Sequence, residues 1–264
     1  MAFPAYPGKH ALEPCVTPSD WLSYLRELYD WDGLPRLAGV ILTYSPGFFD
    51  RVAARPEWRE LESPLSGSHS FFVTGSDDHL VGMVGRFGVG SPAAANRLED
   101  LAAAGVTRFI SIGMAGGIQP DLEVGDLVVC TEAVRDEGVS HHYLESGERA
   151  LPSAELTSAL AASLREQAGP VREGPSWTID APYRETVDEL HHYRSSGILT
   201  VEMEAAALAA VALVRRVQFA TAFTVSDSLA RLPWRPQFHN DRVAAGLNRL
   251  LEAAVTTLRA VHAP

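Results

Sequence analysis

The strongest constraint on the fold is an alternation of short apolar runs with helix-like stretches along most of the chain. Each run has the length of a β-strand and ends in small or polar residues. The runs are Ala38–Thr43, Phe71–Thr74, Leu80–Val84, Arg108–Ile112, Asp126–Thr131 and Phe219–Val225. Because parallel strands need crossover connections that are usually helical, this alternation predicts one α/β domain with a largely parallel central sheet.

Start and stop signals mark the helices between these runs. Ser91 and Pro92 suit the first turn of a helix that stops near Gly105. The other predicted helices are Ser19–Tyr29, Leu151–Gln167, Val201–Arg215 and Asp241–His262. We predict an amino-terminal arm with a short helix over residues 1–37, and one α/β domain over residues 38–264 that no linker or repeat divides.

The net charge and the cysteine content limit the classes of partner and metal site that the sequence allows. The 264 residues have a net charge of -11, and the 22 Lys and Arg residues form no run, which argues against nucleic-acid and membrane partners. Cys15 and Cys130 are the only cysteines, too few for a disulfide framework or a four-ligand zinc site. We therefore expect no metal and a cytoplasmic location, since prolines interrupt the opening stretch where a signal segment would lie.

Two glycine-containing turns follow predicted strands. In the segment 86–92, Gly88 and Gly90 allow close backbone approach, and the free amides of the helix start favour an anion. In the segment 111–117, small residues follow a strand, and ligands bind at the carboxyl ends of parallel strands. Either turn is equally compatible with tight packing alone.

Two acidic segments complete the candidate site. Glu202 and Glu204 bracket Met203 at a predicted helix start, where carboxylates are either solvated or turned inward to accept hydrogen bonds from sugar hydroxyls. Asp227 follows Ser226 at the end of an apolar strand, where it either forms a turn or delivers a proton to a leaving group.

Together these segments resemble the nucleoside phosphorylase family, which includes the hexameric purine nucleoside phosphorylases, uridine phosphorylases and the hydrolytic methylthioadenosine nucleosidases. The resemblance runs from about Gly39 to the final helix, and is most specific in residues 113–120, 124–126 and 201–205. It implies a single α/β domain whose twisted sheet is partly rolled into a barrel and flanked by helices. It also implies a homo-oligomer, either a dimer or a hexamer built from dimers, that uses no metal or other cofactor.

The resemblance implies roles for individual residues. Met203 would lie against the ribose, Glu204 would hold its hydroxyls, and Asp227 would protonate a departing purine. The remaining substrate-binding candidates are Glu202, Gly116, Ala115, Met114, Ser226, Tyr183, Arg184 and His10. The family reaction is phosphorolysis of the N-glycosidic bond, which gives a free base and ribose 1-phosphate and uses inorganic phosphate as co-substrate.

The phosphate site departs from the family pattern. Ser111 stands where these phosphorylases usually have an arginine, and Met114 where they have a serine or threonine. Arg86 and Arg51 can supply the missing charge, with Gly88 and Ser111 beside them. Two alternatives stay open: a hydrolytic nucleosidase that uses water, and a protein that binds nucleosides without catalysis.

The sequence says less about the identity of the base and about the role of the amino-terminal arm. Tyr183 and Arg184 lie where uridine phosphorylases read uracil, but without the full pattern, and Asp227 favours a purine. His141 and His142 belong either to a ligand-side loop or to solvated surface. In relatives a histidine near the start of one subunit reaches the sugar of its neighbour, and His10 is the candidate here.

Overall fold

The structure is a computed structural model that describes residues 6–65, 70–76, 79–147, 149–230 and 234–260. Its strands join in one eleven-stranded mixed sheet. They are β1 (Gly39–Thr43), β2 (Trp58–Glu60), β3 (Phe71–Thr74), β4 (Val81–Val84), β5 (Arg108–Gly117), β6 (Leu127–Asp136), β7 (Arg149–Ala150), β8 (Arg172–Ile179), β9 (Thr200–Glu202), β10 (Gln218–Ser228) and β11 (Arg235–Pro236).

Five strands close into a ring. β5 pairs with β10, β10 with β6, β6 with β8, β8 with β9, and β9 returns to β5. From this ring the sheet continues through β1 and β4 to β3 and β2. The α/β domain with a partly rolled sheet is thereby confirmed, and the sheet is mixed because β5–β9 and β6–β10 are antiparallel.

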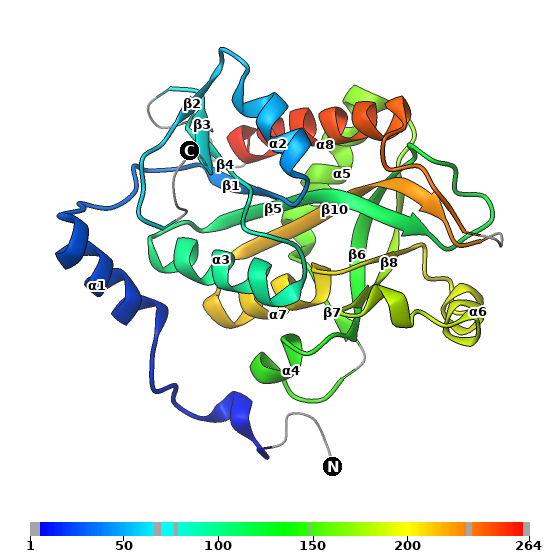
Figure 1. Cartoon of the computed structure of the whole chain (residues 1–264), viewed down its shortest axis with the longest axis horizontal. Helices are drawn as coiled ribbons and strands as arrows, with labels where there is room; N and C mark the ends of the chain where they lie inside the picture. Colours follow the sequence, from blue (N-terminus) through cyan, green and yellow to red (C-terminus); the bar gives the residue numbers. More distant parts are fainter. Residues whose placement is uncertain (1–5, 66–69, 77–78, 148, 231–233, 261–264) are drawn as a thin grey trace.

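Helices cover both faces of the open part of the sheet (Figure 1). On one side lie α2 (Pro46–Ala53), α5 (Ala154–Ala168) and α8 (Asp241–Ala260), and on the other α3 (Ser91–Ala103) and α7 (Ala205–Arg215). Alternate residues of β1 serve the two layers: Val40 and Leu42 pack with the α3 and α7 side chains, whereas Ile41 packs with those of α2 and α8.

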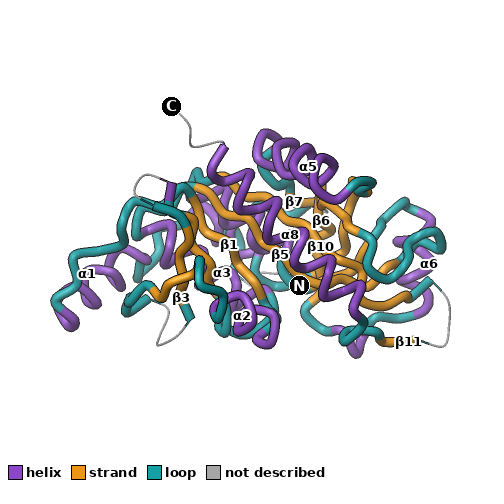
Figure 2. The backbone as a smooth tube through the Cα atoms, turned by 90° about the horizontal axis from the view of Figure 1, so that it is seen from above, coloured by secondary structure: helices purple, strands orange, loops and turns teal. Residues whose placement is uncertain are grey.

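The shorter elements lie at the periphery. The arm carries η1 (Lys9–Ala11) and α1 (Pro18–Tyr29), which sits against α3 at one end of the molecule (Figures 1 and 2). At the other end lies α6 (Val187–Ser195), after the short η3 (Pro182–Arg184). The helix α4 (Ser140–Tyr143) packs on η1 and α7.

Several expected boundaries were wrong, and two of them concern the candidate site. Residues 113–117, expected as a loop, continue β5 because each is paired with β10, from Phe223–Gly113 to Ser228–Gly117. Val201 and Glu202, expected in a helix, form β9, and α7 begins only at Ala205. In both cases pairing with strands distant in sequence overrides local composition.

Candidate active site

Gly116 brings two of the predicted segments together. On β5 it pairs with Val201 of β9 on one side and with Asp227 of β10 on the other. A Cβ atom on Gly116 would lie 3.1 Å from Cγ1 of Val201 and 3.4 Å from Oδ2 of Asp227. The absence of a side chain at Gly116 therefore lets the acidic end of β10 lie close to the strand that leads to Glu204.

Glu204 connects the starts of α7 and α3. It is the N-cap residue of α7, is 7% exposed, and accepts a hydrogen bond of 2.6 Å at Oε1 from the backbone N–H of Gly90. The Ser91 hydroxyl donates to the carbonyl oxygen of Met203 at 2.8 Å. The glycine turn before α3, where Gly88 and Gly90 have positive φ, thus holds the Met203–Glu204 segment with one of its amides.

Glu202 supports this segment from below. Its Oε2 accepts 2.7 Å hydrogen bonds from the backbone N–H groups of Glu204 and Ala205, and its Oε1 accepts from the hydroxyl of Thr178 at 2.5 Å. Burial raises the pKa of Glu202, although these hydrogen bonds oppose the shift. The fixed Glu202 carboxyl therefore sets the geometry of the α7 start.

The pKa of the Glu204 carboxyl lies well above its ordinary value. Burial, followed by the nearby charge of Glu202, raises the pKa of Glu204 to about 8, against the opposing hydrogen bonds from the backbone of Gly90 and Met203. Below about pH 8 this carboxyl mainly keeps its proton. It can accept hydrogen bonds from hydroxyls, and once ionised it can stabilise a positive charge that develops beside it.

Asp227 is held at both oxygens. The Ser226 hydroxyl donates to Oδ1 and the indole N–H of Trp234 donates to Oδ2, each at 2.7 Å, and the residue is 6% exposed. Glu185 lies close enough for the Asp227 charge, second to burial, to help raise its pKa to about 7. Sequence reasoning missed Trp234 and Glu185, because only the tertiary fold brings them to β10.

Two of the candidate phosphate-binding residues, Arg86 and Ser111, already have hydrogen-bond partners. Arg86, which has a φ of 59°, donates from Nε to Oδ1 of Asp50 at 2.7 Å, and both side chains are about half exposed. The hydroxyls of Ser111 and Tyr44 are 2.8 Å apart. Arg51 is exposed, with its guanidinium beside Gly47.

Tyr44 is a further residue that sequence reasoning missed. It directly follows β1, whose end pairs with β5, and its ring packs edge-on against Phe87 and close to Gly113. Burial and the charge of Glu204 raise the pKa of Tyr44 well above its usual value, so the hydroxyl stays neutral. Its position directly after the apolar run that forms β1 was the available sequence signal.

The remaining predicted residues lie elsewhere or pack within the chain. Met114 is half-buried against the α2 and α8 layer, Ala115 is buried, and the Ala115 carbonyl accepts from the Ser226 hydroxyl at 3.3 Å. The Tyr183 side chain is 98% exposed, and Arg184 is also exposed. Their roles toward a base stay predictions.

The histidines pack between the arm and α4. Nε2 of His10 lies 3.4 Å from Oε1 of Glu145 in the same chain. Nε2 of His141 lies 3.1 Å from the carbonyl oxygen of Arg135, and Nδ1 of His142 lies 2.9 Å from Nζ of Lys9. The helix α4, which carries His141 and His142, is thus packed against its own chain, and a role of His10 in a neighbouring subunit stays a prediction.

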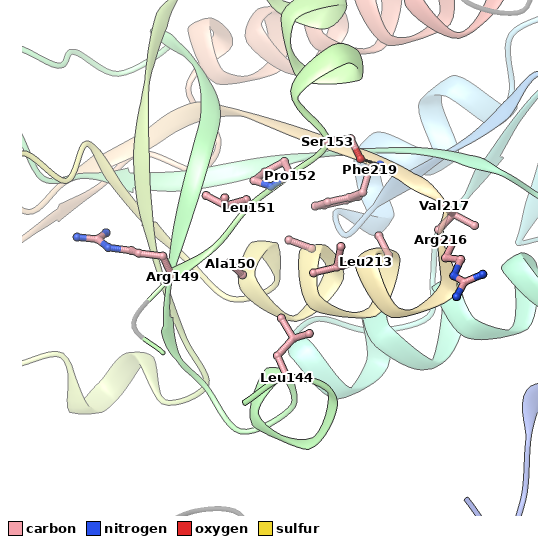
Figure 3. A pocket seen from close by; sticks show the side chains of 12 residues that line it. Leu144, Arg149, Ala150, Leu151, Pro152, Ser153, Leu213, Arg216, Val217 and Phe219 are labelled. Carbon is pink, nitrogen blue, oxygen red and sulfur yellow. Dashed lines mark hydrogen bonds between the residues drawn. The ribbon is translucent and has the colours of Figure 1, made fainter. Parts of the chain in front are cut away.

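A surface pocket of about 510 Å³ lies around the carboxyl end of α7 (Figure 3). Its lining residues are Leu144, Arg149, Ala150, Leu151, Pro152, Ser153, Ala209, Ala212, Leu213, Arg216, Val217 and Phe219. None of them is a predicted site residue, and Glu204 stands at the opposite end of the same helix. This pocket is therefore separate from the candidate site.

Comparison with known proteins identifies the family. The sequence model of the phosphorylase superfamily matches residues 39–258. The chain belongs to the phosphorylase superfamily. It is 29% identical to the guanosine phosphorylase of Halorubrum lacusprofundi, over 85% of this chain and 92% of that protein. It is 30% identical to the purine nucleoside phosphorylase of Plasmodium vivax, over 83% of this chain and 89% of that protein.

A solved structure shows the same fold for this superfamily member. The purine nucleoside phosphorylase of Toxoplasma gondii in complex with immucillin-H superposes with a TM-score of 0.76 at 19% identity, covering 86% of this chain and 92% of that one. Among the residues that the structure of this chain describes, no cluster of three or more His, Cys, Asp or Glu side chains is placed to hold a metal ion. None of the described helices is long and apolar enough to cross a membrane.

Proposed function

We propose that this protein cleaves the N-glycosidic bond of a nucleoside by phosphorolysis, with purine nucleosides favoured, and releases a free base and ribose 1-phosphate. The observation that carries the proposal is the placement of Asp227 and of the Val201–Glu204 segment on either side of Gly116. The relatives named above are phosphorylases, which supports phosphorolysis over hydrolysis.

Cleavage of the bond requires the site to stabilise two opposite charges that develop close to each other. As the bond breaks, positive charge builds on the sugar and negative charge on the base. In this proposal Glu204 accepts hydrogen bonds from the ribose hydroxyls and stabilises the positive charge, while Met203 forms an apolar wall beside the sugar. Asp227 gives a proton to the base, so that the electron pair of the broken bond remains on a neutral leaving group.

Inorganic phosphate would attack the sugar carbon with one of its oxygens as the base departs. One hydroxyl of the Tyr44 and Ser111 pair donates to the other, which leaves one O–H to donate to a phosphate oxygen. Arg86 would contribute charge-assisted hydrogen bonds, shared with Asp50, and Arg51 would contribute a second positive charge.

We also propose that the protein is a homo-oligomer and lies in the cytoplasm, in keeping with the family resemblance.

The deciding experiment incubates the protein with a panel of purine and pyrimidine nucleosides, with and without phosphate. Release of base that depends on phosphate, together with ribose 1-phosphate, is the expected result. Equal release without phosphate, with free ribose as product, would establish the hydrolytic alternative and contradict the proposal. Nucleoside binding by calorimetry without turnover would instead identify a protein that only binds nucleosides.

A further inference from the structure

The hydrogen bond between Trp234 and Asp227 is a contact of the candidate site that the function above does not use. The indole Nε1 lies 2.7 Å from Oδ2 of Asp227. Trp234 is 50% exposed, whereas Asp227 is 6% exposed. The indole N–H therefore reaches inward from the surface to a carboxyl that is otherwise closed off from solvent.

The hairpin of β10 and β11 places this N–H. Asp227 pairs with Pro236, and Ser228 pairs with Arg235, in antiparallel register. The backbone N–H of Gln237 donates to the carbonyl of Ser226 at 3.1 Å, which fixes the returning strand beside Asp227. Trp234 directly precedes this pairing, and its ring makes an edge contact with Phe238 at 6.2 Å between centroids.

The two donors fix the carboxyl group. The Ser226 hydroxyl occupies Oδ1 and the Trp234 indole occupies Oδ2, so rotation of the carboxyl about its bond to Cβ would break both hydrogen bonds. Each carboxyl oxygen has two lone pairs, so Oδ2 retains an acceptor position besides the one Trp234 takes. A Cβ atom on Gly116 would lie 3.4 Å from Oδ2 and 3.1 Å from side-chain atoms of Leu229 and Val201, so glycine is what allows the carboxyl to lie this close to β5.

We propose that Trp234 is a positioning residue for proton transfer by Asp227, an inference that rests on the proposed function. In the transfer, the O–H bond of the Asp227 carboxylic acid breaks, an N–H bond forms on the base, and the electron pair stays on the carboxylate. The indole N–H keeps the carboxyl in one orientation and stabilises the negative charge left on Oδ2. Hydrogen bonds to charged groups are stronger than those between neutral groups.

The test compares two leaving groups. A purine base needs a proton when it leaves, whereas p-nitrophenolate is stable as an anion and needs none. Trp234→Phe should lower kcat with a purine nucleoside by roughly tenfold or more, on the scale of one hydrogen bond to a charged group. With p-nitrophenyl riboside its kcat should stay within about twofold of the wild type, and KM for the purine nucleoside should change little.

An isosteric variant and a neighbour serve as controls. Benzothienylalanine at position 234 keeps the bicyclic ring but has sulfur in place of the N–H, and should reproduce the defect of Trp234→Phe. Phe238→Leu removes the ring contact of Trp234 but keeps the indole N–H. It should retain the wild-type ratio of the two activities.

The outcomes separate the two claims. Equal loss on both substrates in Trp234→Phe would mean a general structural role, and full activity on both would mean no role; either result overturns the inference while the proposed function stands. A wild-type protein that releases base from no nucleoside would refute the proposed function, and this inference with it.

Discussion

The backbone N–H of Gly90 donates a hydrogen bond of 2.6 Å to Oε1 of Glu204, although 114 positions separate the two residues in the sequence. The contact joins the glycine turn before α3 to the start of α7, and Glu204 is buried where it forms. If Glu204 holds the sugar, the turn therefore sets the position of the sugar site.

Glu204→Gln tests the proposed sugar contact. The amide oxygen can still accept from Gly90, but an amide cannot ionise, whereas the Glu204 carboxyl can lose its proton and so stabilise the positive charge that develops on the ribose. We expect kcat/KM for base release to fall by about two orders of magnitude or more. Glu166→Gln, at an exposed position of α5, is the matched control and should behave as wild type. Normal activity in Glu204→Gln would mean that the site is misplaced.

The same substitution should change how stability depends on pH. The pKa of Glu204 is raised from 4.5 to about 8 by burial and by Glu202, so the folded protein keeps a proton that the unfolded chain has lost between these values. Glu204 therefore weakens folding increasingly as the pH rises from about 5 to about 8, by at most about 1.4 kcal/mol per pH unit.

The free energy of unfolding, measured in urea at pH 5, 6.5 and 8, checks this expectation. The Glu204→Gln protein should gain stability relative to wild type as the pH increases, whereas the Glu166→Gln control should keep a constant difference. A constant difference for Glu204→Gln as well would show that Glu204 titrates alike in the folded and unfolded states.

Asp227→Asn tests the proton donor. Asparagine retains an oxygen that can accept from Ser226 or Trp234, but its amide does not release a proton as a carboxylic acid does. We expect turnover of purine nucleosides to fall by about two orders of magnitude or more. Asp32→Asn, at an exposed position, is the control. Undiminished purine release by Asp227→Asn would remove Asp227 from the mechanism.

The ion pair of Arg86 and Asp50 leads to opposite predictions for the KM for phosphate when one or the other residue is replaced. Arg86→Gln should raise the KM for phosphate by roughly tenfold, the scale of a charge-assisted hydrogen bond, with the nucleoside KM little changed. Asp50→Asn should lower the phosphate KM, because it frees the guanidinium from its present partner. Both side chains are about half exposed, so neither change should cost much stability.

Initial-rate kinetics at varied phosphate check these two substitutions, with Arg59→Gln at an exposed position of β2 as the control. A phosphate KM that responds to neither substitution would place the phosphate site away from Arg86.

Gly246→Ala tests the packing of α8 on the sheet. A Cβ atom on Gly246 would lie 2.7 Å from Cβ of Thr224, a buried residue of β10. Overpacking of this kind costs about 1–3 kcal/mol, which outweighs the better helix propensity of alanine, about 1 kcal/mol. Thermal unfolding should therefore show a less stable protein. A more stable variant would mean that α8 moves away from β10 at little cost.

The sequence by itself determined the α/β class, the position of the most regular elements and the segments that carry the chemistry. Helical spacing located α8 from its first residue, Asp241, and apolar runs located β1 and β4 to within a residue, because local periodicity reflects which side of an element is buried. The acidic residues near the ends of β9 and β10 were also visible, since unusual polar residues beside apolar runs stand out in any such chain.

Only the tertiary structure decided the strand status of residues 113–117 and 200–202, and the partner of each site group. A glycine-rich segment becomes a strand through hydrogen bonds to strands far along the chain, which no local pattern encodes. The contacts of Glu204 with Gly90, of Tyr44 with Ser111 and of Trp234 with Asp227 have the same origin. They depend on strand register and helix docking, and burial then sets the energy of each contact.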